Sequence, residues 1–438
     1  MNKIQASNPF FEIYSTPHGT VPFNLIKTEH YAPAIHEGIR RQNGEIDAII
    51  NNPDAPTFEN TIVPYEKSGE LLHRVNTVFG NLLSAETDDA LQELAREIMP
   101  LMSEHENNIS LNEKLFARIK TVYELADKAK LTPEQSKLLE DIYTGFVRNG
   151  ANLQGNAKEQ YRNLCKELSL LTLQFSENTL KETNDYRLVL TEKSQLSGLP
   201  ESAIDAAAET AQEKGVEGWV FTLHAPSYSP FMTYADNRDL RRELYMAYNT
   251  KCTHDNACNN LEIVKKIANI HMEIARLLGY DNFAEYNLKE RMAQNSDTVY
   301  KLLNQLLEAY TPTAQKEYDE VQALARSEEG ADFILMPWDW SYYSQKLKDR
   351  KFSINDEMLR PYFELSKVKE GVFGLASKLY GITFKKNADI PVYHKDVEAY
   401  EVFDKDGTYL AVLYTDFHPR TGKRSGAWMT SYKGQWID

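Results

Sequence analysis

The sequence predicts a mainly α-helical protein with a small antiparallel β-sheet near its carboxyl terminus. Apolar residues recur with a period near 3.6 along most of the 438 residues. Residues 132–135 have the pattern of a capping box, with proline at the first helical position. Two runs, 398–403 and 408–416, are instead rich in tyrosine, valine and phenylalanine, and residues 404–407 between them end in Asp-Gly. This combination indicates a β-hairpin in a helical protein.

The helical period places the individual helices. A segment beginning at Ser296 carries a continuous apolar stripe, and we expect Pro312 to kink or end that helix. A second helix, over 263–278, is followed by Gly279, where a left-handed C-terminal cap is expected. A short strand is expected over 219–224. Further helices are expected over 31–51, 58–84, 88–108, 112–129, 161–175, 200–214, 236–249, 339–350 and 362–380.

Composition excludes several classes of protein. The 49 Lys plus Arg against 64 Asp plus Glu give a net charge of −15, which argues against a nucleic-acid or membrane-surface partner. Hydrophobic residues make up 42% of the chain, which excludes a disordered protein. No stretch approaches the ~20 apolar residues of a membrane span, residues 1–10 lack the apolar core of a signal peptide, and cysteines are few. These features favour the cytoplasm.

The length of the chain predicts more than one structural region. Single hydrophobic cores stop growing near ~250–300 residues, so at least two lobes are expected, with a cleft between them. We expect an N-terminal helical region over 1–150 and a second helical region over 151–438. The second region contains the small β-sheet, which is expected within 397–430.

Neither catalytic nor metal-ligating residues can be assigned from spacing. A zinc peptidase helix needs His-Glu-x-x-His, so that two imidazoles face one way, and the His-Glu pairs at His36 and His105 lack the second histidine. Cys252, His254 and Cys258 match no standard zinc pattern. Reduced structural cysteines are the favoured interpretation.

Three segments are similar to known sequence signatures. Residues 337–343 fit Pro-Trp-Asp-x-x-Tyr-Tyr, and residues 414–428 fit Tyr-x-Asp-x-x-x-Arg-x-Gly-Lys-Arg-x-Gly-Ala-Trp. Residues 56–61 resemble Pro-Thr-Phe-x-Asn-Thr. Together they resemble the thimet oligopeptidase and peptidyl-dipeptidase family of zinc metallopeptidases, and the bacterial dipeptidyl carboxypeptidase branch looks nearest.

The resemblance implies a fold and a substrate surface. The implied fold is a helical array of two lobes flanking a deep, narrow channel, with a small sheet whose edge strand borders the active site. We expect Ser425, Gly426, Ala427 and Trp428 to form that strand and to bind short, extended peptides through main-chain hydrogen bonds. Ordinary strand packing of small residues is the alternative for this stretch.

Two other groups in these signatures have simpler interpretations. Trp338, Tyr342 and Tyr343 are expected to pack in a core beside a helix cap formed by Asp339. Arg420, Lys423 and Arg424 could recognise the carboxylate at a peptide's C-terminus, but solvated loop charges are the favoured interpretation.

In the family that the chain resembles, His-Glu-x-x-His and a further glutamate ligand follow the Gly-Ala-Trp segment, and the sequence ends at Asp438 before such a motif. We therefore expect the N-terminal portion of a longer zinc peptidase. Zinc would belong to the complete protein, with none bound by this chain, which would bind peptides without cleaving them. The alternative is a non-catalytic helical protein that binds extended peptides by edge-strand addition. The apolar end, residues 435–438, is expected to leave an uncovered edge that favours self-association.

Overall fold

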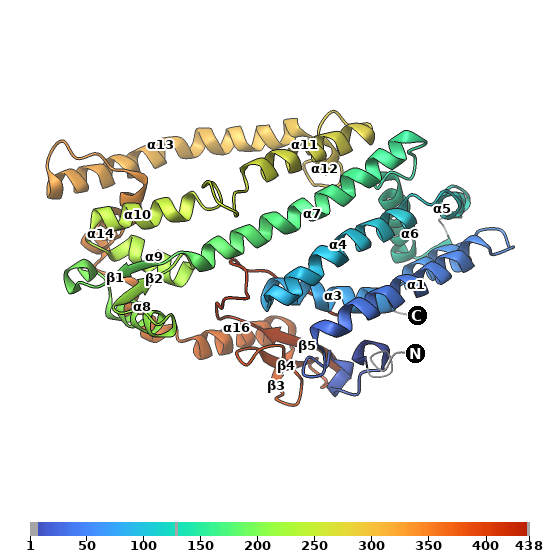
Figure 1. Cartoon of the computed structure of the whole chain (residues 1–438), viewed down its shortest axis with the longest axis horizontal. Coiled ribbons are helices and arrows are strands. Elements are labelled where there is room, and N and C mark those ends of the chain that lie inside the picture. Colours follow the sequence, from blue (N-terminus) through green and yellow to red (C-terminus); the bar gives the residue numbers. More distant parts are fainter. Residues whose placement is uncertain (1–7, 128–129, 436–438) are drawn as a thin grey trace. The chain divides into compact units, whose positions relative to one another are not determined.

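The computed structural model describes residues 8–127 and 130–435, and helices account for most of them (Figure 1). The α-helices are α1 (Tyr31–Ile50), α2 (Val63–Lys67), α3 (Glu70–Ala85), α4 (Asp89–Ser110), α5 (Glu113–Leu125), α6 (Pro133–Arg148), α7 (Asn156–Asp185), α8 (Glu201–Glu213), α9 (Ala225–Tyr234), α10 (Arg238–Asn249), α11 (Leu261–Leu277), α12 (Phe283–Leu288), α13 (Ser296–Glu329), α14 (Trp340–Phe352), α15 (Asp356–Leu359) and α16 (Leu365–Tyr380). Short 3-10 turns lie at Pro9–Phe11, Pro17–Gly19, Thr28–His30, Lys193–Leu196, Pro337–Asp339 and Arg360–Tyr362, and a π-helical turn lies at Phe58–Ile62.

In the described part of the chain, five strands form two antiparallel sheets. The strands are β1 (Leu188–Leu190), β2 (Trp219–Phe221), β3 (Thr383–Lys386), β4 (Glu398–Phe403) and β5 (Tyr409–Thr415). β1 pairs with β2, and the second sheet has the order β3-β4-β5. The hairpin of β4 and β5 confirms the expected hairpin, and its register shifts between Val402 and Phe403. Because β4 lies in the middle, β3 and β5 are the edges of this sheet.

Most expected helices are confirmed, including the capping box at Thr132, and Gly279 has the expected positive φ of 85°. The expected helix over 58–84 is wrong as one unit, because Gly69 adopts φ 75° and starts α3 after a break. Of the two outcomes expected at Pro312, an end of the helix is wrong, since α13 continues through it to Glu329, and a kink stays a prediction. The helix is exposed there, so water can satisfy the carbonyl that proline leaves free.

Other differences concern ends and short elements. α5 ends at Leu125, and residues 128–129 of the expected helix lie outside the described residues. The expected strand over 219–224 is shorter, because α9 already begins at Ala225. β1, β3 and α9 were not expected from the sequence.

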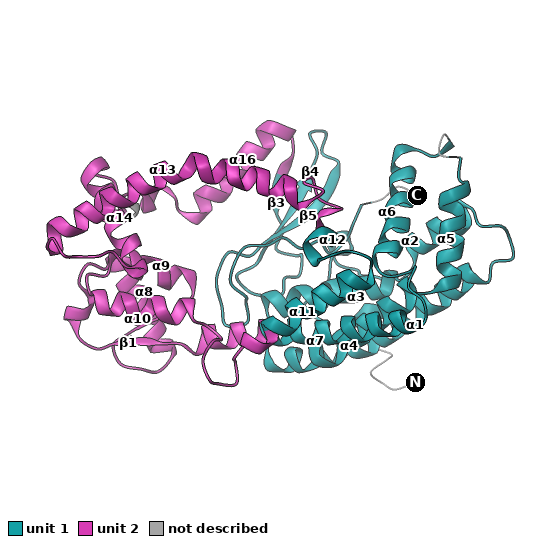
Figure 2. Cartoon of the chain, turned by 90° about the horizontal axis from the view of Figure 1, so that it is seen from above, with its two compact units in different colours: residues 1–175, 264–286, 384–438 teal, residues 176–263, 287–383 magenta. Residues whose placement is uncertain are grey.

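The chain divides into two compact units, each discontinuous in sequence (Figure 2). Unit 1 contains residues 1–175, 264–286 and 384–438, and unit 2 contains residues 176–263 and 287–383. These bounds differ from the expected division after residue 150, which stays a prediction about folding regions.

Unit 1 has two apolar clusters built on helices with one hydrophobic face. In the first, α1, α3 and α4 bury side chains such as Ile35, Phe79 and Ile98 beside Phe10 from the N-terminal segment. The second surrounds Leu115, with residues of α5 and α6 packed against the end of α1. Apolar burial of this kind is the main force that holds such helices together.

Unit 2 contains a buried charge cluster at residues 337–343, which we call the first signature segment. The Asp339 side chain is fully buried and accepts hydrogen bonds from Arg238 (2.7 Å) and from Arg241 (2.9 Å), whose side chain is 1% exposed. Burial raises the pKa of Asp339, but hydrogen bonds from Arg238, the Met336 backbone and Arg241 outweigh burial and lower it. Asp339 makes no side-chain cap to α14, so the expected helix cap is wrong.

The aromatic part of the same expectation is confirmed, because the half-buried Trp338 packs against the apolar cluster around Phe231 and the two tyrosines are buried. Tyr342 and Tyr343 are buried in a cluster between α13 and α14. Tyr342 also lies under the Arg241 guanidinium, 4.0 Å from the ring centroid. Among the described residues, none of the helices is long and apolar enough to cross a bilayer.

Removing the Asp339 carboxylate tests this cluster. Asp339→Ala leaves the buried Arg241 cation without its charged partner, and we expect the free energy of unfolding to fall by about 3–5 kcal/mol. Urea denaturation followed by circular dichroism measures the change. Asp205→Asn, at an exposed position of α8, is the control and should change the free energy by less than about 0.5 kcal/mol. Equal effects of the two variants would contradict the assignment.

Candidate functional site

The second signature segment, residues 414–428, begins in the last two residues of β5 and is organised by one carboxylate. Arg420 donates to the two oxygens of Asp416 at 2.8 and 2.7 Å. Lys423 donates to Asp416 at 2.9 Å, and the Tyr393 hydroxyl does so at 2.9 Å. Burial raises the pKa of Asp416, but these hydrogen bonds outweigh burial and hold it well below its usual range. Asp416 is therefore a charged, fixed acceptor.

The loop that follows Asp416 is attached to the C-terminal end of α3. Arg420 donates to the Ala85 carbonyl at 2.5 Å and forms an ion pair with Glu86. The Thr87 amide donates to the Gly422 carbonyl at 2.8 Å, and the Arg424 amide donates to the Ser84 carbonyl at 3.0 Å. A helix end leaves carbonyls without helical partners, and this loop supplies donors to them.

Arg420 and Lys423 are not solvated loop charges, so that expectation is wrong for them. Their side chains are only 11% and 10% exposed. The Lys423 ammonium donates to the Asp416 carboxylate, the Asp416 carbonyl and the His418 carbonyl, which uses its three donors. Both cations serve the structure of the loop. Arg424 is exposed, as expected.

Ser425, Gly426, Ala427 and Trp428 do not form a strand, so the expected edge strand is wrong as secondary structure. Gly426 has φ 109°, which interrupts an extended run and favours glycine. Within the described residues, 425–430 make no backbone–backbone hydrogen bond. Their role in binding peptides is untested and stays a prediction.

The far end of this exposed stretch is fixed by Tyr432. Its ring lies 5.6 Å from the Phe23 ring and 5.8 Å from the Tyr414 ring, between centroids. The Asn81 amide donates to its hydroxyl. Residues 425–431 are therefore an exposed segment between two attached ends, Arg424 and Tyr432.

Sequence reasoning missed two partners of this site, Glu86 and Tyr393. Glu86 is 334 positions away from Arg420, and no local pattern connects the two. The sequence did carry a local signal for the other two partners of Asp416, because Arg420 lies four residues and Lys423 seven residues after it.

The cysteine-containing loop holds buried thiols in their protonated form. Cys252 and Cys258 are buried free thiols, as the sequence suggested. Burial, together with a hydrogen bond to Glu182, raises the pKa of Cys252 to about 11, so the thiol stays protonated near neutral pH. Across residues 8–127 and 130–435, no group of three or more His, Cys, Asp or Glu side chains is placed to hold a metal ion.

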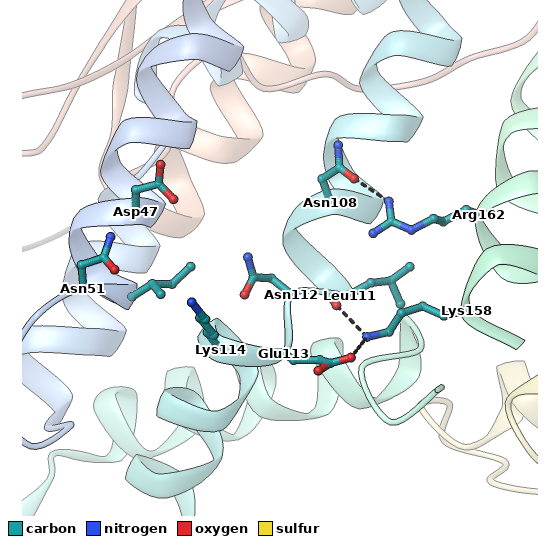
Figure 3. Close-up of a pocket in the computed structure, with 10 residues that line it drawn as sticks. Asp47, Asn51, Asn108, Leu111, Asn112, Glu113, Lys114, Lys158 and Arg162 are labelled. Carbon is teal, nitrogen blue, oxygen red and sulfur yellow. Dashed lines mark hydrogen bonds and ion pairs between the residues drawn. The ribbon is translucent and has the colours of Figure 1, made fainter. Parts of the chain in front are cut away.

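A separate pocket of about 580 Å³ lies in unit 1 among α1, α4, α5 and α7 (Figure 3). Two of its cations, Lys158 and Arg162, already have partners in the wall. Lys158 donates to the Leu111 carbonyl at 3.0 Å and to Glu113 at 2.8 Å, and Arg162 donates to Asn108 at 2.5 Å. The pocket is open and polar, and none of the residues that line it belongs to the three signature segments.

Comparison with known proteins identifies the family. Residues 231–436 match the model described as Peptidase family M3. The chain belongs to this family, as the three signatures predicted.

The similarity to individual members extends over almost the whole chain. This chain is 36% identical over 430 residues to Dipeptidyl carboxypeptidase of Escherichia coli (strain K12), and the alignment covers 98% of this chain and 63% of that relative. It is 34% identical over 424 residues to Oligopeptidase A of the same organism, covering 96% of this chain and 62% of that relative. Saccharolysin of Saccharomyces cerevisiae is 25% identical over 407 residues, covering 87% and 56%. The chain thus spans less than two thirds of the length of these relatives.

Neutralising Asp416 tests its role as the organising acceptor. Asp416→Asn keeps the shape but removes the charge that Arg420 and Lys423 share, and we expect faster amide hydrogen exchange over residues 420–430. Hydrogen–deuterium exchange with mass spectrometry measures this. Asp389→Asn, at an exposed position of unit 1, should leave the same peptides unchanged. Unchanged exchange in Asp416→Asn would contradict the role.

Gly422 tests the close approach between the loop and α3. A Cβ at this position would lie 2.4 Å from the Thr87 carbonyl oxygen, so the backbone must move. We expect Gly422→Ala to break the Thr87–Gly422 hydrogen bond and to lower the free energy of unfolding by about 1–3 kcal/mol. Thermal and urea unfolding measure the change. Gly44→Ala in α1, where a Cβ meets no atom within 4 Å, should not destabilise the protein.

Proposed function

We propose that this chain forms the peptide-binding part of an M3-type oligopeptidase or dipeptidyl carboxypeptidase. In this proposal, residues 425–428 hold short, extended peptides by their main chain. Membership of Peptidase family M3 and relatives named Oligopeptidase A and Dipeptidyl carboxypeptidase support peptides as the substrate class. The channel that the resemblance implies, between two lobes, is part of the proposal.

The observation that carries the proposal is the unpaired backbone of residues 425–430 between two attached ends. Among the described residues it makes no backbone–backbone hydrogen bond, while the Arg424 amide and Tyr432 fix its ends. An extended peptide can pair with such a segment, because main-chain donors and acceptors recognise backbone whatever the side chains. The small side chains of Gly426 and Ala427 leave room for a second backbone to approach.

Binding without cleavage is also part of the proposal. The sequence contains no His-Glu-x-x-His. The described residues do not fit the zinc centre that the family implies, because they bring together no set of metal-binding side chains. We therefore assign no catalytic step to them. A cytoplasmic location is proposed on the sequence features alone.

Peptide binding can be measured directly on this chain. An unstructured peptide of about six to eight residues, close to the usual strand length, should slow amide exchange over 425–430 in hydrogen–deuterium exchange. Ala427→Pro removes one donor and should weaken binding about three- to tenfold in calorimetry. Met429→Ala is the control, because it removes a fully exposed side chain and keeps the backbone.

Two outcomes would contradict the proposal. Protection of the β5 edge, 409–415, without protection of 425–430 would show that the peptide pairs with the sheet instead. Chelator-sensitive hydrolysis of the peptide by the purified chain, followed by mass spectrometry, would show that the chain cleaves peptides by itself. The concentration dependence of sedimentation tests the self-association expected at the C-terminal edge.

A further inference from the structure

The three cations of the second signature segment have different surroundings. Arg420 and Lys423 are buried and share two carboxylates, Asp416 and Glu86, so two positive charges meet two negative ones. Arg424 is exposed, and no carboxylate among the described residues forms an ion pair with it. This local cluster therefore has one positive charge in excess.

Arg424 is nevertheless held in place. Its amide donates to the Ser84 carbonyl at 3.0 Å, which fixes its backbone on the end of α3. Its guanidinium lies 4.4 Å from the centroid of the Trp428 ring. A guanidinium over an aromatic ring is held there by cation–π attraction. This attraction does not use the N–H donors as hydrogen bonds, so they can still bind a planar anion.

From this arrangement we infer that Arg424, held over the Trp428 ring, recognises a carboxylate group of the peptide that lies along residues 425–428. The inference rests on the proposed function, since it assigns a specificity-determining residue to the same site. The carboxylate can come from the C-terminus of the peptide or from an acidic side chain. Both present the same pair of oxygens, to which an arginine donates two parallel hydrogen bonds.

The charge of the whole chain strengthens the inference. With a net charge of −15, the protein repels anionic peptides at long range, and a local cation is needed to hold a carboxylate. Arg420 and Lys423 are unsuited to this task, because their donors are used by Asp416, by Glu86 and by main-chain carbonyls. A single exposed arginine is ordinary, but one fixed at both its backbone and its guanidinium is prepared to bind.

The experiment compares three forms of one peptide by calorimetry on this chain. The first has a free C-terminal carboxylate, the second is amidated, and the third is amidated but carries one internal glutamate. The proteins are the wild type, Arg424→Gln, Arg424→Lys and the control Arg276→Gln, which removes an equal charge from an exposed position of α11 in the same unit.

We expect the wild type to bind at least one carboxylate-bearing peptide about three- to tenfold more tightly than the plain amide, less so at high salt. Arg424→Gln should bind all three peptides alike, and Arg424→Lys should keep part of the preference. Arg276→Gln should behave as the wild type. Preference for the first or the third peptide identifies the source of the carboxylate.

The two proposals fail in different ways. If the wild type binds the three peptides equally, or if Arg276→Gln loses the preference as Arg424→Gln does, the role of Arg424 is wrong and peptide binding still holds. If the wild type binds none of the peptides, the proposed function is wrong and the role of Arg424 falls with it.

Discussion

The exposed segment of unit 1 depends on the charge of Asp416. Burying a carboxylate is costly unless several donors replace the lost water, and Asp416 receives hydrogen bonds from Arg420, Lys423 and Tyr393. Arg420 also bonds to the end of α3, so one acceptor connects the edge strand β5, the loop and a helix. Most of residues 425–430 can then remain exposed, without a backbone–backbone hydrogen bond to any described residue, and the segment is still no free tail because both of its ends are attached.

In unit 2, a buried aspartate likewise organises the signature segment over residues 337–343. Asp339 is fully buried and accepts hydrogen bonds from Arg238 and Arg241. In both segments, the aspartate of the family signature is therefore a structural acceptor for two cations. The matched residues hold the backbone in place, and the reactive chemistry that the family name suggests does not come from these aspartates. The same reasoning explains why Arg424, which has no such acceptor among the residues that the structure describes, is the cation that can serve a ligand.

The helices were predictable because their signals are local. The capping box at Thr132 and the left-handed Gly279 were read from neighbouring residues and are confirmed. The hairpin was predictable from alternation and an Asp-Gly turn. Short elements were missed: β1 has three residues, too few to show alternation, and its pairing with β2 joins residues about thirty positions apart. The helix end expected at Pro312 did not occur for another reason, since an exposed helix tolerates a lost hydrogen bond.

The candidate site shows where sequence reasoning reached its limit. The signature drew attention to residues 414–428, but it suggested a strand at Ser425–Trp428 and free charges at Arg420 and Lys423. A strand requires a partner strand, and an ion pair requires an acceptor such as Glu86, 334 positions away from Arg420. The sequence by itself determined the helical class, the hairpin and the family. Only the tertiary structure decided which cations form ion pairs with carboxylates and which described stretch of backbone makes no backbone hydrogen bond. Both depend on contacts between residues far apart in the chain.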